Sequence, residues 1–349
     1  MSYRLGVLAG DGIGPEIVPA AVQVIDAALA ATGATADWVP LPVGAAAIET
    51  HGSALPDVTV EALATLDGWL LGPHDSASYP AEHRAQLNPS GFLRKHFDLF
   101  ANIRPAQAFD GTPALVPGLD LVVVRENTEG FYADRSTYRG TGEYMPTPDV
   151  AIAMGIFTRP AIERIARQAC ELALRRRQHL TIVHKANVLR TTTGFFLEIC
   201  RAVAADYPQL EVDDFHIDAM TVHLVRRGAD FDVLVTENMF GDILSDLTGE
   251  LAGSLGIAPS INASHERAMA QAAHGSAPDI AGRGVANPTA MIASGAMLLD
   301  WLGAGTAAET ITRGLRAAVA DGVRTADLGG TAGTAEFAAA VVKTIDDLA

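Results

Sequence analysis

Apolar residues along this chain gather in short runs, which alternate with longer segments where apolar positions recur every three or four residues. The short runs predict buried strands at 3–9, 69–71, 120–125 and 231–236. The longer segments predict helices at about 15–32, 160–178, 191–206, 241–255 and 288–303. This alternation of strands and helices indicates an α/β protein.

Residues 133–150 fit neither pattern, because they are polar and include glycines and prolines. A long excursion of this kind is uncommon in a compact domain unless it has a function. We expect it to be an arm that reaches a partner subunit.

Composition narrows the classes of function. The 349 residues carry 25 Lys and Arg against 41 Asp and Glu, a net charge of -16, which disfavours nucleic acid and anionic membranes as partners. No apolar run approaches the length of a membrane span, and the first residues lack a signal-peptide pattern, so we expect no membrane association. Cys170 and Cys200 lie in helical patterns and are typical of reduced core thiols, which favours a cytoplasmic protein.

A glycine-rich turn, Gly10–Gly14, follows the first predicted strand. A Rossmann dinucleotide fingerprint would need its third glycine at position 15, which is Pro15. The turn is therefore either a tight turn that needs glycine for its backbone angles, or part of a dinucleotide site in a different fold.

Carboxylates and one lysine follow other predicted strands. Asp242 and Asp246 share one face of a helix that begins after the strand 231–236, and their mutual repulsion favours a bound Mg²⁺ or Mn²⁺. Asp218 is a third candidate ligand; the alternative is a solvated acidic face. Lys185 follows the apolar stretch LTIVH and is a candidate for proton transfer, or else a surface lysine.

Three arginines leave apolar elements, namely Arg94, Arg104 and Arg125. Their guanidinium groups would match the carboxylates of a di- or tricarboxylic acid substrate. The alternative is internal salt bridges to Asp98 or Glu126.

A long irregular loop, 274–288, leads into the helix at 288–303 and is rich in glycine. Glycine permits close approach of a ligand to the backbone. Asp279 could accept hydrogen bonds from ribose hydroxyls and would repel a 2′-phosphate, which favours NAD over NADP. A structural Ω-loop is the alternative.

Taken together, these segments resemble the β-decarboxylating dehydrogenase family, which includes isopropylmalate, isocitrate, homoisocitrate and tartrate/D-malate dehydrogenases, and the isopropylmalate type most closely. The segments are GDGIGPEI, LRKHFDLFANIRP, VVRENTEGFY, HKANVL, NMFGDILSDLTGELAGSLG, HGSAPDIAGRGVANP and RTADLGGTAGTAEF.

The resemblance implies a two-domain fold with a central mixed sheet and no Rossmann domain. Residues 1–99 plus 255–349 would form a large cofactor-binding domain. Residues 100–254 would form a small domain for substrate, metal and dimerisation, with the arm at about 133–150. A homodimer with shared active sites is implied, with a tetramer as the alternative.

The resemblance also implies a role for each candidate residue. Substrate would bind to Arg94, Arg104, Arg125, Asn88 and Ser90. Tyr132 and Lys185 would be the acid–base pair. The metal would bind to Asp242, Asp246 and Asp218 of the partner subunit. NAD would contact Ile13, Asn187, His274, Gly275, Ser276, Ala277, Asp279, Ile280 and Asn287.

The implied reaction is an NAD-dependent, Mg²⁺- or Mn²⁺-dependent oxidative decarboxylation of a 3-substituted (2R)-malate. The motifs favour 3-isopropylmalate; isocitrate, homoisocitrate, tartrate and D-malate are the alternatives, and a non-catalytic regulatory subunit is less favoured. One departure from the family pattern is that Gln271-Ala272-Ala273 replaces an acidic residue followed by proline.

Overall fold

The computed structural model describes residues 1–84 and 87–348. Within them the main strands are β1 (Ser2–Leu8), β2 (Thr35–Pro40), β3 (Gly68–Leu71), β4 (Ala101–Gln107), β5 (Asp120–Glu126), β8 (His179–His184), β9 (Glu211–His216), β10 (Val233–Thr236), β11 (Ile261–Ala263) and β12 (Ala268–Ala270). The helices are α1 (Gly14–Ala31), α2 (Ala45–His51), α3 (Asp57–Leu63), α4 (Ala81–Arg84), α5 (Pro89–His96), α6 (Arg159–Leu174), α7 (Thr193–Ala204), α8 (Ile217–Arg227), α9 (Asn238–Ala252), α10 (Thr289–Trp301), α11 (Gly305–Ala320) and α12 (Thr334–Leu348). Short 3₁₀ helices include η2 (Ala133–Arg135) and η5 (Ala326–Leu328).

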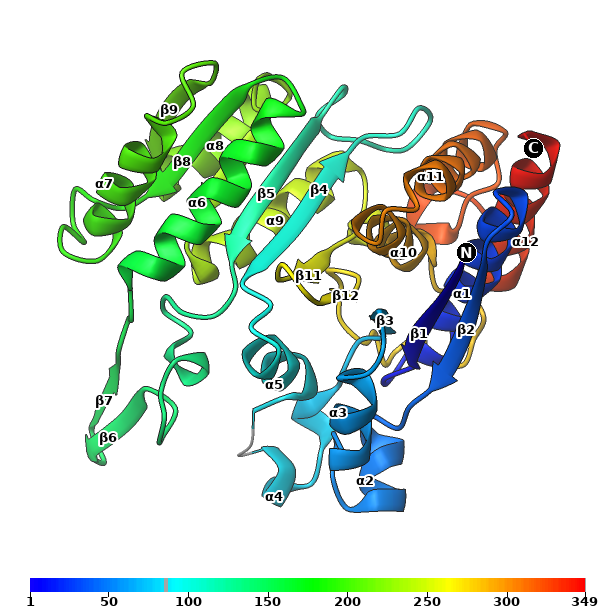
Figure 1. The fold of residues 1–349 in the computed structure, drawn as a ribbon, viewed down its shortest axis with the longest axis horizontal. Coiled ribbons are helices and arrows are strands. Elements are labelled where there is room, and N and C mark those ends of the chain that lie inside the picture. Colours follow the sequence, from blue (N-terminus) through cyan, green and yellow to red (C-terminus); the bar gives the residue numbers. More distant parts are fainter. Residues whose placement is uncertain (85–86, 349) are drawn as a thin grey trace.

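The main strands form one sheet in the order β2-β1-β3-β12-β11-β4-β5-β10-β8-β9 (Figure 1). Pairing is parallel from β2 to β12 and again from β5 to β9. The two parallel groups are joined by β11 and β4, which pair antiparallel with each other and with their other neighbours. The predicted α/β class with a central mixed sheet is confirmed, and the strand order is not that of a Rossmann fold.

The predicted division into 1–99 plus 255–349 and 100–254 stays a prediction. A continuous sheet passes through both parts, because β4 pairs with β11 across the proposed boundary. The junction is nevertheless where the sheet changes from parallel to antiparallel pairing.

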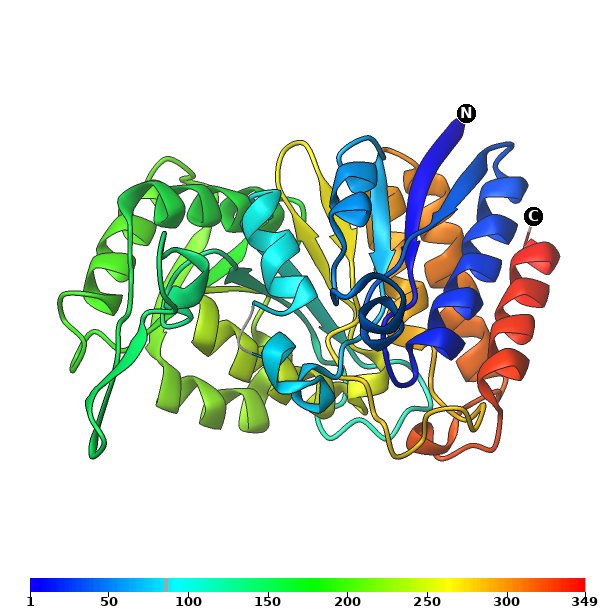
Figure 2. The same ribbon diagram turned by 90° about the horizontal axis from the view of Figure 1, so that it is seen from below.

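The middle of strand β5, residues 121–124, is entirely apolar because both faces of the sheet are covered there. Val122 and Val124 pack in one core with α6 and α7, whereas Leu121 and Val123 pack in a second core with α8 and α9. Figure 2 shows helices on both faces of this half of the sheet. Successive side chains of a strand point to opposite faces, so both sets must be hydrophobic when both faces are covered.

Several predicted boundaries differ from the observed ones; the helix predicted at 241–255, for example, runs from Asn238 to Ala252. The helix predicted to reach residue 178 ends at Leu174, because Arg176 and Arg177 turn away to pair with Asp120 and Asp232. The strand predicted at 231–236 begins at Val233.

Strand β9 was not predicted at all. It lies at the edge of the sheet and carries acidic residues, so it has no continuous apolar run.

Helix α1 is the one helix in the described part of the chain whose length and composition would allow it to cross a membrane. It packs against α10, α11 and α12, and its apolar residues belong to the core that these helices share. This packing is typical of a core helix in a globular protein.

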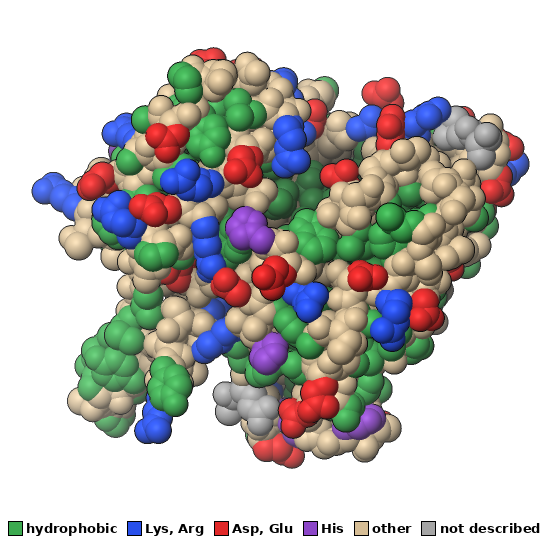
Figure 3. All heavy atoms as spheres, in the orientation of Figure 1, with side chains coloured by type: hydrophobic (Ala, Val, Ile, Leu, Met, Phe, Trp, Pro, Cys, Tyr) green, Lys and Arg blue, Asp and Glu red, His purple; other side chains and the backbone are tan. Residues whose placement is uncertain are grey.

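The segment predicted as an arm contains a hairpin formed by β6 (Glu143–Thr147) and β7 (Val150–Ala153). Every residue of both strands is exposed. The hairpin projects from the body of the molecule, and hydrophobic side chains such as Tyr144, Met145 and Ile152 cover part of it (Figures 1 and 3).

Candidate active site

A cavity of about 220 Å³ lies where the two halves of the sheet meet. Its charged lining consists of Arg94, Arg104, Arg125, Arg135 and Asp242. Its neutral polar lining includes His74, Ser76, Asn88, Ser90, Gln271 and His274. The three arginines predicted from sequence are therefore brought together, and a fourth joins them.

Arg125 ends strand β5 and is 1% exposed. Its Nε and Nη2 donate to Oδ1 of Asn238 at 3.0 and 2.8 Å, and its Nη1 donates to Oδ1 of Asp242. A Cβ at Gly241 would lie 2.5 Å from Cγ of Arg125, so only glycine lets the first turn of α9 pass over this side chain.

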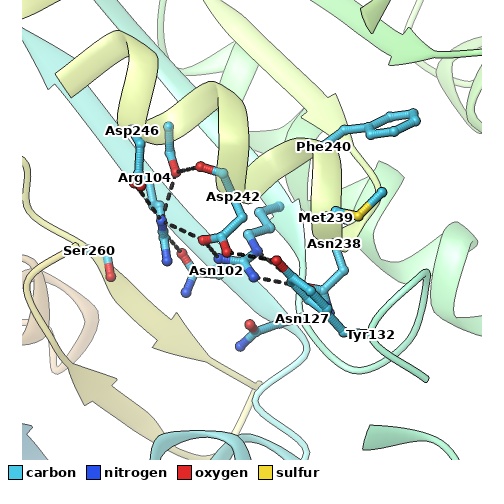
Figure 4. A network of polar contacts seen from close by, with 12 residues as sticks. Asn102, Arg104, Asn127, Tyr132, Asn238, Met239, Phe240, Asp242, Asp246 and Ser260 are labelled. Carbon is cyan, nitrogen blue, oxygen red and sulfur yellow. Dashed lines mark hydrogen bonds and ion pairs between the residues drawn. The ribbon is translucent and has the colours of Figure 1, made fainter. Parts of the chain in front are cut away.

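Arg104 approaches the same carboxylate from β4 (Figure 4). Its Nη1 donates to Oγ of Ser245 at 2.7 Å and to Oδ1 of Asp242 at 3.2 Å, and it lies 3.7 Å from Oδ1 of Asp246. Its Nε donates to Oδ1 of Asn102 at 2.8 Å. Burial, with the neighbouring Arg125, lowers the pKa of Arg104 to about 10, which leaves the group charged at neutral pH.

The alternative, internal salt bridges to Asp98 or Glu126, is not what these arginines form among the described residues; Arg104 and Arg125 pair with Asp242. Asp98 pairs with Arg164, and Glu126 accepts from the Thr128 hydroxyl and nearby backbone amides. Arg104 and Arg125 instead face Asp242 and the cavity.

Tyr132 reaches the same carboxylate, since its hydroxyl donates to Oδ2 of Asp242 at 3.1 Å (Figure 4). Burial and the charge of Asp242 raise the pKa of Tyr132, so the phenol keeps its proton. Burial alone would raise the pKa of Asp242, but Arg125 and Arg104 outweigh it and hold that pKa below its usual range. Burial and the charge of Asp242 raise the pKa of Asp246.

Two cavity arginines differ from the others, because they have no carboxylate partner in the described part of the chain. Nη2 of Arg94 donates to the side-chain oxygen of Gln271 at 3.3 Å. Nη1 of Arg135 donates to the side-chain oxygen of Asn238 at 3.1 Å, and its guanidinium lies 5.0 Å from the ring centroid of Tyr132. Sequence reasoning missed Arg135, which follows Tyr132 in η2, at the start of the segment predicted as an arm.

Asn88 and Ser90 both lie at the start of α5 and line the cavity, as predicted for substrate-binding residues. Oδ1 of Asn88 caps the helix by accepting from the Gly91 amide at 2.7 Å. The Ser90 hydroxyl donates to Oε1 of Gln271 at 2.8 Å. The departure at Gln271 thus places a neutral amide beside two candidate substrate-binding residues.

His74, in the loop that follows β3, also lines the cavity. Both ring nitrogens are buried without a hydrogen-bond partner among the described residues. Burial, helped by the charge of Arg94 and opposed by Asp11, lowers the pKa of His74 to about 4. The imidazole is therefore neutral near pH 7.

Lys185 and Asp218 lie apart from this cavity. Nζ of Lys185 donates to Oδ1 of Asp218 at 2.5 Å, and this hydrogen bond lowers the pKa of Asp218. Within one chain, the described contacts do not bring Lys185 to Tyr132, or Asp218 to Asp242. Asn187 is exposed on the same loop as Lys185.

The predicted cofactor loop packs against the glycine-rich turn. The Ile13 amide donates to the Ser276 carbonyl at 2.9 Å, and a Cβ at Gly12 would lie 2.0 Å from that oxygen. His274 and Gly275 line the cavity, and Asp279 is exposed. The remaining loop residues predicted to contact NAD, Ala277 and Ile280, are partly buried.

At its far end the loop is anchored by a residue that sequence reasoning missed. Nδ2 of Asn287 donates to Oδ2 of Asp327 at 2.9 Å, and the Ser254 hydroxyl donates to the same oxygen at 2.6 Å. The Thr325 hydroxyl donates to the other oxygen of Asp327 at 2.6 Å. Asp327 therefore holds the end of the loop against η5 and the segment that follows α9.

The donor set fits a hard divalent cation only in part. Asp242 and Asp246 present carboxylate oxygens from one face of α9, which suit Mg²⁺ or Mn²⁺. No group of three or more potential ligand side chains occurs among residues 1–84 and 87–348. A complete site would need a further donor.

An arginine-lined cavity beside paired carboxylates, a protonated tyrosine and a glycine-rich loop can bind carboxylate groups and donate a proton. The chain belongs to the isocitrate/isopropylmalate dehydrogenase family, whose sequence profile matches residues 4–341. It is thus a member of a family of dehydrogenases.

Relatives with two different names are equally similar to this chain. An isocitrate/homoisocitrate dehydrogenase of Thermus thermophilus is 42% identical over 349 residues, covering 100% of both chains. A 3-isopropylmalate dehydrogenase of Archaeoglobus fulgidus is 41% identical over 344 residues, covering 98% of this chain and 99% of the relative. The crystal structure of isocitrate dehydrogenase from Methylococcus capsulatus superposes with a TM-score of 0.90 at 41% identity, covering 98% of this chain and 99% of that one.

Proposed function

We propose that this protein catalyses the NAD-dependent oxidative decarboxylation of a 3-substituted (2R)-malate, with Mg²⁺ or Mn²⁺ bound. The observation that carries the proposal is the convergence of Arg104, Arg125 and Tyr132 on Asp242 inside one cavity. The presence of Lys185 and both α9 carboxylates favours an enzyme over a non-catalytic regulatory subunit.

In this proposal the arginines orient the substrate. Arg94, Arg104 and Arg125 bind its carboxylates, which fixes the C2–H bond toward the loop that would hold NAD. The residues proposed to hold NAD are Ile13, His274–Ala277, Asp279, Ile280, Asn287 and, from the loop of Lys185, Asn187. Bound NAD would accept the hydride from C2.

Asp242 and Asp246, with Asp218 of the partner subunit, would hold the divalent cation. The cation would lower the pKa of the C2 hydroxyl and stabilise the negative charge that develops as CO₂ leaves. Lys185 of the partner subunit would take the hydroxyl proton, and Tyr132 would supply a proton to C3. The products are a 2-oxo acid, CO₂ and NADH, with the hydroxyl proton balanced by the one added at C3.

We propose that a second copy of the chain completes the site. Val222 and Val225 of α8 and Ile243 of α9 are 54%, 55% and 52% exposed, which leaves an apolar face on the helices that carry Asp218 and Asp242. A homodimer that buries this face, with the arm reaching the partner, would bring Lys185 and Asp218 to the other copy's cavity. The free, buried thiols of Cys170 and Cys200 support a cytoplasmic location.

Mixing two inactive variants tests the shared site. Lys185→Ala and Tyr132→Phe should each be inactive, because each removes one member of both sites in a homodimer. After subunit exchange, a mixed dimer has one doubly altered site and one intact site, so about a quarter of wild-type activity should return. No recovery, despite mixed dimers seen by native mass spectrometry, would refute sharing.

Measuring NADH formation tests the reaction itself. The Mg²⁺-supplied protein would be offered isopropylmalate, isocitrate, homoisocitrate, tartrate and D-malate, with NADP in parallel. The sequence motifs favour 3-isopropylmalate, but the lining by Asn88, Ser90 and Gln271 favours a polar substituent on C3. We therefore place isocitrate and homoisocitrate first. If no 3-substituted malate is oxidised, the proposed function is wrong.

A further inference from the structure

The cavity contains more positive charge than its own carboxylates neutralise. Arg104 and Arg125 share Asp242, but Arg94 and Arg135 contact only neutral side-chain oxygens among the described residues. The Nε atoms of Arg94 and Arg135 are buried without any partner. A buried guanidinium without an opposite charge is costly, so an anion is expected to bind beside these two groups.

Arg94 and Arg135 belong to one region of the cavity. Lys95 donates to the Thr137 carbonyl at 2.9 Å, which ties α5 to the segment that carries Arg135. Among neighbouring charges, Arg135 contributes most to the lowered pKa of Arg94, after burial. Both guanidinium groups line the same cavity, and neither has a carboxylate partner among the described residues.

The side chains around this pair are polar and neutral. The single amide oxygen of Gln271 accepts from both Ser90 and Arg94. An acidic residue at 271, which the family pattern would place there, would neutralise Arg94. Phe92 does not supply an apolar wall, since it is 39% exposed and stacks on His96.

Counting charges separates the possible substrates. A malate core has two carboxylates, which the predicted set of Arg94, Arg104 and Arg125 would bind. Arg135 remains, and a branched alkyl group on C3 would leave it without a charged partner in the cavity. A carboxylate on the C3 substituent would pair with it and accept its bidentate hydrogen bonds.

We propose that Arg135 is a specificity-determining residue that binds a third carboxylate, carried by the C3 substituent, so that the substrate is a tricarboxylic hydroxy acid. Gln271 assists because its neutral amide leaves Arg94 and Arg135 free to attract the anion. This inference rests on the proposed function, whose substrate it specifies.

A binding experiment tests the inference without turnover. Tricarballylate and methylsuccinate, which lack the C2 hydroxyl and cannot be oxidised at that position, would be titrated calorimetrically into the protein without metal or NAD. The wild type should bind the tricarboxylate at least tenfold more tightly. Arg135→Gln should lose about 10- to 100-fold in tricarballylate affinity, as expected for a hydrogen bond between charged groups, and little in methylsuccinate affinity.

Arg139→Gln is the matched control. Arg139 lies four residues further along the same segment and sits 5.8 Å from the ring centroid of Tyr138, but it is exposed and outside the cavity. This substitution removes the same charge as Arg135→Gln and should leave the affinities for tricarballylate and methylsuccinate unchanged. Gln271→Glu gives a second, independent variant, and it should weaken tricarballylate binding by placing a negative charge beside Arg94.

Kinetics then separate the two proposals. Arg135→Gln should raise KM for isocitrate or homoisocitrate much more than it changes kcat. Equal losses on every substrate would make Arg135 a positioning residue for Tyr132 and overturn the inference. If the wild type prefers isopropylmalate and binds both probes equally, the inference is wrong and the proposed function stands. Tricarboxylate-selective binding without oxidation of any 3-substituted malate would instead refute the proposed function alone.

Discussion

Asp242 accepts hydrogen bonds from two arginines and from Tyr132, so the phenol is held at the carboxylate proposed to bind the metal. Tyr132→Phe removes only the hydroxyl. Because a positioned proton donor contributes about 10²- to 10⁴-fold, kcat should fall by that factor while KM changes little. Steady-state kinetics would check this, with Tyr138→Phe as control, since Tyr138 is 94% exposed. A kcat within threefold of wild type would remove Tyr132 from the acid–base pair.

The proposed preference for NAD over NADP also depends on a single residue. Asp279 is exposed on the proposed NAD loop, where a carboxylate would repel a 2′-phosphate. Asp279→Lys should raise KM for NAD about tenfold or more, because the carboxylate that accepts from the ribose hydroxyls is lost, and lower KM for NADP, because lysine attracts a 2′-phosphate. Glu309→Lys, an equal charge change at an exposed position of α11, should alter neither constant. Unchanged NAD kinetics in Asp279→Lys would place the ribose elsewhere.

Site residues were predicted well where the residue type is unusual for its position in the sequence. Arg104 and Arg125 stood out because a guanidinium leaving an apolar strand needs a partner. Arg135 did not, because it lies in a polar segment where an arginine is unremarkable. Only the fold shows that this segment begins beneath the cavity before it extends into the arm.

Helix α9 begins at a buried carboxylate whose charge depends on pH. Glu237 accepts from the amides of Met239 and Phe240, yet burial outweighs these hydrogen bonds and raises its pKa to about 7. A raised pKa means that the folded state binds the proton more tightly than the unfolded chain. The stabilisation from this group is therefore complete below about pH 4.5, and it is lost as pH rises through about 7.

Denaturant unfolding at pH 5 and pH 8, at one protein concentration, measures this effect. The Glu237 contribution to the free energy of unfolding should fall by about 2–3 kcal/mol between these values. Glu237→Gln should show a correspondingly smaller difference between the two pH values. Glu250→Gln, an exposed change on the same helix, should behave as wild type. Identical pH dependence in Glu237→Gln and wild type would contradict the assignment.

Helices and strands were predictable from the sequence where a single spacing of apolar residues extended along the whole element. α1 and α10 were located from apolar spacing, because each buries a continuous face. Strand β9 was not predicted because it lies at an edge of the sheet and has only two apolar residues, Val212 and Phe215, among its six positions. Strands β11 and β4 were not located from the sequence, and the resemblance implied only a mixed sheet, since strand direction leaves no mark in a short apolar run.

At the scale of the molecule, the sheet explains why the cavity lies at its centre. The antiparallel strands β11 and β4 interrupt two parallel groups, and Asn262 of β11 accepts hydrogen bonds from Asn102 and Asn127 across the junction. Arg104 is in turn held by Asn102. Arg104 and Arg125 therefore extend from strands at this hydrogen-bonded junction. Lys185 follows β8 and Asp218 lies in α8, away from the cavity.

In the proposed homodimer, activity depends on a second copy of the chain. Val225→Asp would put a charge on the exposed α8–α9 face, and burying that charge in a dimer would cost several kcal/mol. The variant should sediment as a monomer, keep its circular dichroism spectrum, and lose activity, because no partner supplies Lys185 and Asp218. Val58→Asp is the matched control, since Val58 is 56% exposed on α3, against 55% for Val225. A fully active monomer would show that one chain suffices, and an intact dimer would place the interface on another surface.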